Sequence, residues 1–153
     1  MKKYTESCLE QLAIQEKRFN ALYKEAAALF NIPDCSMWIL YYLIISDKDI
    51  TQQDLIKKML FPKQTINSAV NSLAKKELLN LVVIPNTKNK KKLLLTDSGL
   101  KLAQSTVLKL RNAECRAVEN MGKEKMLKFI GLYGEFYSEL QKEFNNFDIL
   151  GKV

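Results

Sequence analysis

The feature that most constrains the fold is a series of four short elements between residues 51 and 96. The stretch "TQQDLIKKML" begins with Thr51 as the expected N-cap of a helix, and Asp54 completes an approximate capping box. Pro62 suits the first turn of a second helix, running to about Asn80, because its missing N–H costs nothing there. The runs "LVVIP" and "KLLLT" then flank "NTKNKK", which predicts a β-hairpin with a basic tip.

The segment before this series also favours helices. Apolar residues recur at three- and four-residue steps from Leu9 to Phe30, which predicts an amphipathic helix ending near Asn31. The next apolar run, "MWILYYLII", could be a buried strand or a buried helix. The start signal at Pro33-Asp34 favours a helix. The low content of glycine (5) and proline (3) also favours helices.

Two long helices are expected after the hairpin. Thr96 is expected to cap a helix that extends to Met121-Gly122, and a last amphipathic helix covers Lys123 to about Phe144. Two short helices followed by a hairpin form the winged version of the helix-turn-helix. The predicted fold class is therefore mostly α with a small β-hairpin wing, in which a winged helix-turn-helix is joined to a further helical region.

The helix that begins at Pro62 has two unlike faces. At about 100° per residue, its apolar residues gather on one side, as a core face does: Ile66, Ala69, Val70 and Leu73. Its other residues carry amides, hydroxyls and positive charge, but no carboxylate: Lys63, Gln64, Thr65, Asn67, Ser68, Asn71 and Lys75. An ordinary solvated face would usually pair Glu with Lys. An acid-free face suits the DNA major groove, where Asn and Gln bond to adenine and Ser or Thr to bases or phosphates.

Positive charge is concentrated around this helix. The segment 46–92 holds ten lysines and four acids, a net charge of +6, whereas the whole chain has a formal charge of +7. The predicted hairpin tip contributes Lys88, Asn89, Lys90 and Lys91. Two interpretations are open: lysines that protect an edge hairpin from aggregation, or a basic surface for a polyanionic partner.

Several classes of protein are disfavoured. The chain has no histidine and no glycine-rich phosphate loop, so nothing indicates an enzyme, a metal site or a cofactor. The N-terminus lacks the apolar run of a signal peptide, and the apolar run 37–45 is too short to span a bilayer. No membrane association is therefore expected, and the expected location is the cytoplasm. Three widely spaced cysteines indicate reduced thiols rather than a disulfide framework.

These motifs give the chain a resemblance to the MarR family of winged helix-turn-helix transcription regulators. The run 51–84 is similar to that family's helix-turn-helix and first wing strand, and "KKLLLTDSG" is similar to its second wing strand and following helix start. The resemblance implies a homodimer that presents two winged helices to double-stranded DNA. It also implies a division into an N-terminal dimerisation helix (1–33), a DNA-binding domain (34–97) and C-terminal dimerisation helices (98–153).

The chain departs from the family pattern at two places. The family's wing commonly carries an Asp-x-Arg pair, but here the segment 86–89 has neither residue. Leu78 stands where the family usually has a glycine, so the turn into the wing must differ or tolerate a side chain. All three arginines lie outside residues 46–92, and Arg is the usual reader of guanine. An A·T-rich operator is therefore expected, read mainly by Gln64, Asn67 and Asn71.

The resemblance also suggests control by a small ligand or an oxidant. An effector pocket is expected to involve four aromatic residues, although plain core packing is the alternative: Tyr23, Trp38, Tyr41 and Tyr42. Cys8 and Cys35 are the candidate redox residues, with unreactive thiols as the alternative.

The function expected from the sequence is a homodimeric, sequence-specific DNA-binding regulator, with repression expected, acting on a pseudo-palindromic operator. Thr51 and Gln52 are further candidate DNA contacts, from the first helix of the helix-turn-helix. The alternative is a winged-helix protein–protein module that does not bind DNA.

Overall fold

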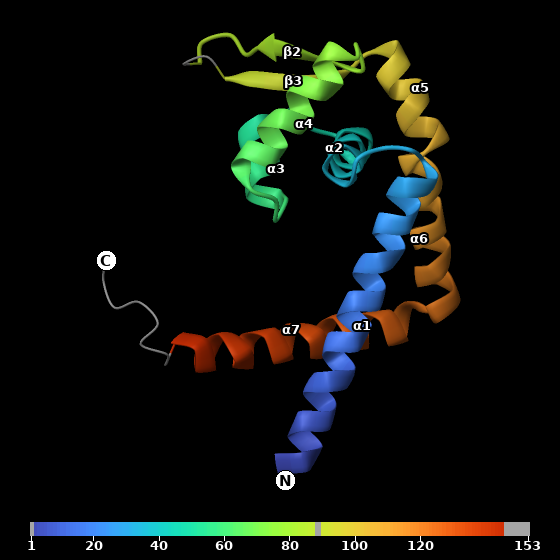
Figure 1. The fold of residues 1–153 in the computed structure, drawn as a ribbon, viewed down its shortest axis with the longest axis vertical. Coiled ribbons are helices and arrows are strands. Elements are labelled where there is room, and N and C mark those ends of the chain that lie inside the picture. Colours follow the sequence, from blue (N-terminus) through green and yellow to red (C-terminus); the bar gives the residue numbers. More distant parts are fainter. Residues whose placement is uncertain (1, 88–89, 146–153) are drawn as a thin grey trace. The chain divides into compact units, whose positions relative to one another are not determined.

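The structure is a computed structural model that describes residues 2–87 and 90–145, and it is mainly helical with one small sheet (Figure 1). The chain divides into two compact units, residues 1–111 and 112–153. The described helices are α1 (Lys2–Leu29), α2 (Asp34–Ile45), α3 (Gln52–Lys58), α4 (Lys63–Lys75), α5 (Asp97–Ser105), α6 (Val107–Met121) and α7 (Lys123–Asn145). The described strands are β1 (Ile50–Thr51), β2 (Leu79–Val83) and β3 (Lys91–Leu95). The predicted fold class is confirmed.

The wing is the β2–β3 hairpin, and it belongs to a three-stranded antiparallel sheet with the order β1-β3-β2. Leu79 pairs with Leu95 at the base of the hairpin, and Val83 pairs with Lys91 toward its tip. The short strand β1, which periodicity did not predict, pairs Ile50 with Leu93. It joins the start of α3 directly to the wing.

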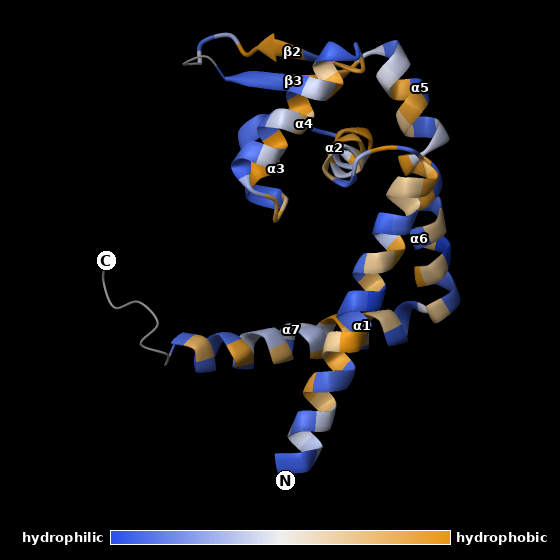
Figure 2. Cartoon of the chain, viewed as in Figure 1, coloured by the Kyte–Doolittle hydropathy of each residue, from blue (hydrophilic) through white to orange (hydrophobic). Residues whose placement is uncertain are grey.

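The core of the first unit is built around α2. Met37, Ile39 and Leu40 are completely buried, so the ambiguous apolar run is a buried helix, as the start signal predicted. The run appears mainly orange where α2 is drawn in Figure 2. Other residues with negligible exposure join this core from α3, α4 and the start of α6: Leu55, Ile66, Val70 and Val107.

The single long helix expected after Thr96 is two helices. The helix is interrupted at Thr106, whose backbone has φ −124° and ψ −84°. This buried side chain donates a hydrogen bond to the Leu102 carbonyl at 2.5 Å. A threonine that bonds back to the carbonyl four residues earlier commonly bends a helix. The expected end near Gly122 is confirmed, since Gly122 has φ +83° and follows the last residue of α6.

The end of α4 also differs from the prediction, because the helix stops at Lys75 instead of near Asn80. Glu77 takes the left-handed conformation, with φ +56°. The Leu78 N–H bonds to the Leu73 carbonyl at 3.0 Å and the Glu77 N–H to the Ala74 carbonyl at 2.9 Å, the two bonds of a Schellman motif. The left-handed position of the turn into the wing is therefore Glu77, one residue before Leu78, and it tolerates a side chain.

Among the described helices, none is by itself long and apolar enough to cross a membrane. The one combination that meets the length and composition criteria is α1 with α2, which meet at a bend of 89°.

Candidate nucleic-acid interface

Helix α4 has one apolar side and one polar side, as the sequence predicted. Ile66, Val70 and Leu73 are buried and Ala69 packs partly against the core. On the other side, Asn67 is half-buried and the remaining polar residues are exposed. The exposed residues are Lys63, Gln64, Thr65, Ser68, Asn71 and Lys75. The apolar side holds the helix on the core, and the acid-free side stays accessible. The role of these polar residues in binding is still a prediction.

The first turn of α3 is held by a complete capping box. Asp54 N–H donates to Thr51 Oγ1 at 3.2 Å, and Thr51 N–H donates to Asp54 Oδ2 at 2.9 Å. The Thr51 hydroxyl also donates to Asp54 Oδ2 at 2.6 Å. Thr51 therefore uses its hydroxyl proton within the chain, although it was also a candidate DNA contact.

These bonds lower the pKa of Asp54, mainly through the Thr51 side chain and then through the Thr51 backbone N–H. Because the folded-state pKa lies below the unfolded value, the ionised carboxylate stabilises the fold above the unfolded pKa. This contribution is lost as the pH falls through the folded pKa. We expect Asp54→Asn to destabilise the protein by about 1 kcal/mol at pH 7, and by less below the usual pKa range of Asp, near 4.

Denaturant unfolding of wild type and variant at neutral and acidic pH measures this difference. Asp47→Asn, at an exposed position outside the capping box, is the matched control and should change little at either pH. An Asp54→Asn effect of the same size at both pH values would exclude the ionised carboxylate as its cause.

A single side-chain hydrogen bond joins the two helices of the helix-turn-helix. Gln52, the first residue of α3, donates from Nε2 to Oδ1 of Asn67 on α4 at 2.5 Å. Both side chains are half-buried. The bond therefore fixes the orientation of Asn67, which was a candidate base reader. Periodicity could not have found it, because the two residues are fifteen positions apart.

The contacts that stabilise the wing differ from the Asp-x-Arg pair that is common in the family. Lys92 on β3 pairs with Asp49, just before β1, with 3.0 Å between Nζ and Oδ2. Near the tip, the Thr87 hydroxyl donates to the Ile84 carbonyl at 2.7 Å, and Asn86 takes a left-handed φ of +58°. Asp49 was not among the predicted residues, because its partner Lys92 lies 43 positions away in the sequence.

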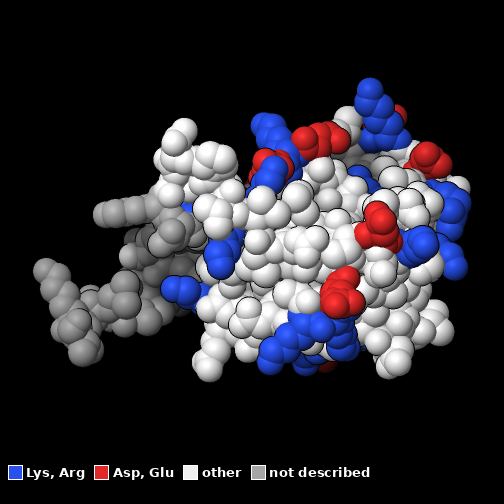
Figure 3. Space-filling view, turned by 90° about the horizontal axis from the view of Figure 1, so that it is seen from above, with Lys and Arg blue, Asp and Glu red and all other residues white. Residues whose placement is uncertain are grey.

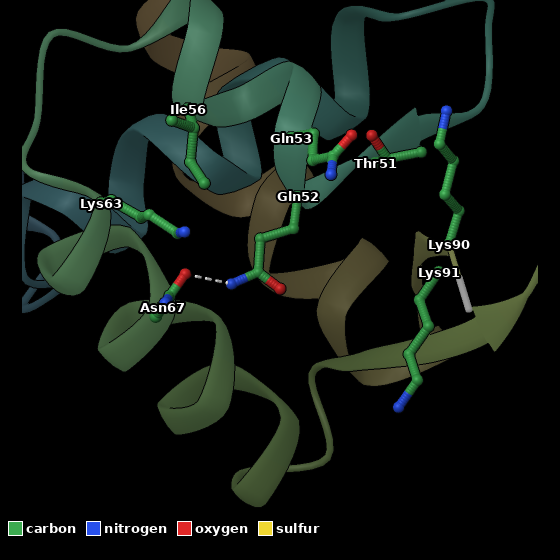
Figure 4. A pocket seen from close by; sticks show the side chains of 8 residues that line it. All are labelled: Thr51, Gln52, Gln53, Ile56, Lys63, Asn67, Lys90 and Lys91. Carbon is green, nitrogen blue, oxygen red and sulfur yellow. Dashed lines mark hydrogen bonds between the residues drawn. The ribbon is translucent and has the colours of Figure 1, made fainter. Parts of the chain in front are cut away.

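The depression between α3, α4 and the wing brings several predicted residues together, with a volume of about 310 Å³ (Figure 4). Its described lining residues are Thr51, Gln52, Gln53, Ile56, Lys63, Asn67, Lys90 and Lys91. None of these residues is acidic. Lys90 and Lys91 are exposed, whereas the predicted Lys88 and Asn89 lie outside the described residues. In Figure 3, Lys and Arg atoms cover more of the visible face than Asp and Glu atoms, in separate groups rather than one patch.

A second depression, of about 410 Å³, lies between α1, α2 and the turn from α3 to α4. Tyr23, Trp38 and Tyr42 line it, and the Tyr23 and Trp38 rings are 4.9 Å apart. Tyr41 is not among its lining residues. It is a buried core residue whose hydroxyl accepts a hydrogen bond from Arg111 Nη1 at 3.2 Å. Tyr41 therefore fits the alternative of plain core packing.

The same depression contains a residue that the sequence did not single out. Asp34 Oδ1 is buried without a hydrogen-bond partner among the described residues, and Asp34 lines the depression. Lys58 also lines it, with Nζ 5.9 Å from the centre of the Tyr42 ring.

The two candidate redox cysteines differ. Cys8 is exposed on α1, as a reactive thiol must be. Cys35 is buried, and the loss of hydration raises the pKa of its thiol, with the Asp34 charge adding to the rise. Burial therefore favours the alternative of an unreactive thiol at Cys35. Among the described residues, no group of three or more His, Cys, Asp or Glu side chains could hold a metal ion.

Comparison with known proteins supports the resemblance noted above. The MarR family model matches residues 30–88. No curated protein matches the chain in sequence. Among solved structures, NMB1585, a MarR family regulator from Neisseria meningitidis, is 18% identical with a TM-score of 0.75, over 90% of this chain and 96% of that chain.

Two further similar structures were solved with a bound molecule. The S. aureus MepR–DNA complex is 20% identical with a TM-score of 0.64, over 84% of this chain and 96% of that chain. NadR in complex with 4-hydroxyphenylacetate is 22% identical with a TM-score of 0.66, over 82% of this chain and 88% of that chain. Residues 30–88 therefore match the MarR family model, and the described chain has the winged helix-turn-helix fold of the MarR family regulators that it resembles.

Proposed function

We propose that the protein is a homodimeric repressor that places α4 in the major groove of a pseudo-palindromic, A·T-rich operator. The observation that carries this proposal is the exposed, acid-free side of α4, held outward by Ile66, Val70 and Leu73. A dimer bound over promoter DNA would exclude other proteins from it, so repression is the expected outcome. The DNA in the MepR complex gives this fold a precedent for the proposed role.

The chemistry of α4 supports readout of adenine. Its exposed amides, Gln64 and Asn71, carry the donor and acceptor that adenine needs in the major groove. The exposed wing residues Lys90 and Lys91 would bind phosphates, which position the protein without reading sequence. With two copies related by a two-fold axis, the half-site centres should lie about one helical turn, or 10 to 10.5 base pairs, apart.

The apolar surface of α7 supports a homodimer. No residue of α7 is buried in the described chain, and orange bands run along it in Figure 2. Its large exposed apolar residues are Leu127, Phe129, Ile130, Leu132, Tyr133, Phe136, Tyr137 and Phe144. A surface of this kind usually marks a contact with another protein. We infer that segments 1–33 and 98–153 contribute the dimer contacts.

Salt dependence separates DNA binding from the alternative, a protein–protein module. The logarithm of the association constant should fall linearly with the logarithm of the salt concentration, with a slope of about −0.9 per neutralised phosphate. Lys90→Ala and Lys91→Ala should each make the slope shallower by about 1. The matched control is Lys101→Ala, an exposed lysine on α5, which should leave the slope unchanged. Absence of duplex binding by the wild-type protein at low salt would favour the protein–protein module.

We also propose that the depression beside Trp38 binds a small phenolic acid that releases the DNA. Tyr23, Trp38 and Tyr42 provide aromatic walls. Asp34 Oδ1 can accept a hydrogen bond from a ligand hydroxyl, and Lys58 can pair with an anionic group. The ligand in the NadR structure, 4-hydroxyphenylacetate, is a suitable probe.

Trp38 is the only tryptophan of the chain, so its fluorescence reports on this depression. Adding 4-hydroxyphenylacetate should change the emission in a saturable way and weaken duplex binding over the same concentration range. Lys58→Met, which removes a lining cation, should require more ligand for both effects. A saturable fluorescence change without any change in duplex affinity would contradict the role in release.

A further inference from the structure

We infer that Gln52 and Asn67 form one composite base reader, in which the two amides together contact a single base pair. The inference rests on the proposed function, since it concerns how α4 reads DNA. It replaces the simpler expectation that Asn67 binds adenine alone. The hydrogen bond from Gln52 Nε2 to Asn67 Oδ1, at 2.5 Å, carries the argument (Figure 4).

This bond uses part of what Asn67 would need in order to read a base alone. A lone asparagine binds adenine by accepting from N6–H with its oxygen while donating to N7 with its nitrogen. Here the Asn67 oxygen already accepts from Gln52. The groups that take no part in this bond are the Asn67 nitrogen, which can donate, and the Gln52 oxygen, which can accept.

The remaining groups match adenine as a pair. Adenine shows an acceptor, N7, beside a donor, N6–H, in the major groove. The Asn67 nitrogen can donate to N7 while the Gln52 oxygen accepts from N6–H. The match does not depend on how the two amides are assigned, because reversing both still leaves one donor and one acceptor.

The surroundings place the pair where a base could reach it. Lys63, Asn67 and Asn71 follow one another at four-residue steps, so they lie along one strip of α4, and Lys63 and Asn71 are exposed. The pair lines the depression that also contains Lys63, Lys90 and Lys91. Figure 4 shows Gln52 reaching across this depression from α3 to α4. A carboxylate is absent from the described lining, so nothing there repels a phosphate or the electron-rich edge of a base.

The pair is also held in place from both sides. Gln52 is the first residue of α3 and follows the N-cap Thr51, whose capping box fixes the start of the helix. Asn67 follows the completely buried Ile66. Neither amide can turn far without breaking the bond between them, so removing either side chain should release the other.

The test measures base preference at every position of the operator for four proteins: wild type, Gln52→Ala, Asn67→Ala and the double variant. Selection from randomised duplexes with wild-type protein first supplies the operator. Both single variants should lose preference for adenine at the same base pair, by about 5- to 100-fold. The double variant should lose no more than the worse single variant, because the second change removes an already broken contact.

Matched variants distinguish a loss of base preference from misfolding and from a general loss of affinity for DNA. Gln52→Asn keeps the amide but is one methylene shorter, so it should behave as Gln52→Ala does. Gln53→Ala removes the neighbouring exposed amide of the same depression and should leave the preference at that base pair intact. Circular dichroism and cooperative thermal unfolding should show that every variant keeps its fold.

Two results would overturn the inference while leaving the proposed function standing. One is loss of preference at different base pairs in the two single variants. The other is a uniform loss of affinity in Gln52→Ala with its base preferences unchanged, which would make Gln52 a phosphate contact only. Failure of the wild-type protein to bind any duplex would overturn the proposed function and this inference together.

Discussion

Replacing Gly99 by alanine is expected to lower the free energy of unfolding by more than about 3 kcal/mol, because the new methyl group would meet the backbone. Its Cβ would lie 1.8 Å from the Leu78 carbonyl oxygen and 2.8 Å from the carbonyl carbon. Overpacking against side chains usually costs about 1 to 3 kcal/mol, and backbone yields less readily than a side chain. For a domain of ordinary stability this is a large fraction of the total.

The close approach at Gly99 is fixed by three hydrogen bonds around Thr96. The Thr96 hydroxyl donates to the Glu77 carbonyl at 2.6 Å and its N–H donates to the Leu78 carbonyl at 3.2 Å. The Gly99 N–H then donates to Thr96 Oγ1 at 3.0 Å, which caps α5. These bonds join the end of α4 to the end of the wing, so the whole "LTDSG" motif positions the wing.

Denaturant unfolding of Gly99→Ala measures the effect. Ser98→Ala is the matched control, since Ser98 is exposed in the same turn of α5 and should change stability by less than about 1 kcal/mol. If Gly99→Ala were as stable as wild type, the contact between the start of α5 and the Leu78 backbone would not exist as described.

Introducing a carboxylate on α4 should have the largest effect on DNA binding. Ser68→Glu is expected to raise the dissociation constant for the operator at least about 100-fold, because like charges brought together at an interface cost several kcal/mol. Ser68 is exposed in the middle of the acid-free side, so the change should leave the fold intact. Fluorescence anisotropy with a labelled duplex measures the difference.

Two control variants isolate the cause of that loss. Ser68→Ala removes the hydroxyl without adding charge and should weaken binding far less than Ser68→Glu. Ser98→Glu adds the same charge at an exposed serine on α5 and should have little effect. Equal losses from Ser68→Glu and Ser98→Glu would mean that net charge governs binding and that the α4 surface has no special position.

Local patterns predicted most of the secondary structure. The apolar steps of α1, the capping box at Thr51, the proline before α4 and the β-prone runs around the basic tip are all signals within about ten residues. The structure has an element at each of them. The two faces of α4 were also predictable, because helical geometry alone decides which of its residues share a side.

Features that depend on contacts across the fold were not predictable. The break at Thr106 arises from a side chain that bonds back to Leu102, although the apolar pattern continues through it. The end of α4 is set by Glu77 in a conformation that favours glycine, and a glutamate at that position is not a helix stop signal. The strand β1 is only two residues long and exists because β3 pairs with it.

The same distinction applies to the candidate site. The sequence identified the acid-free side of α4, but neither the Gln52–Asn67 bond nor the Lys92–Asp49 pair, both of which join residues distant in sequence. It also gave no measure of burial at Cys35, where the loss of hydration raises the pKa of the thiol. The sequence was enough to predict which residues share one side of a helix. It was not enough to predict which side chains from different elements bond to one another.

The proposed function requires that the polar side of α4 reads base edges in the major groove. The most direct measurement is the affinity of the wild-type protein for its operator when adenine is replaced, one position at a time, by 7-deazaadenine. This base keeps pairing but lacks the N7 acceptor that the major groove displays. We predict that affinity falls at two clusters of positions about one helical turn apart. Unchanged affinity at every adenine of the operator would contradict the claim.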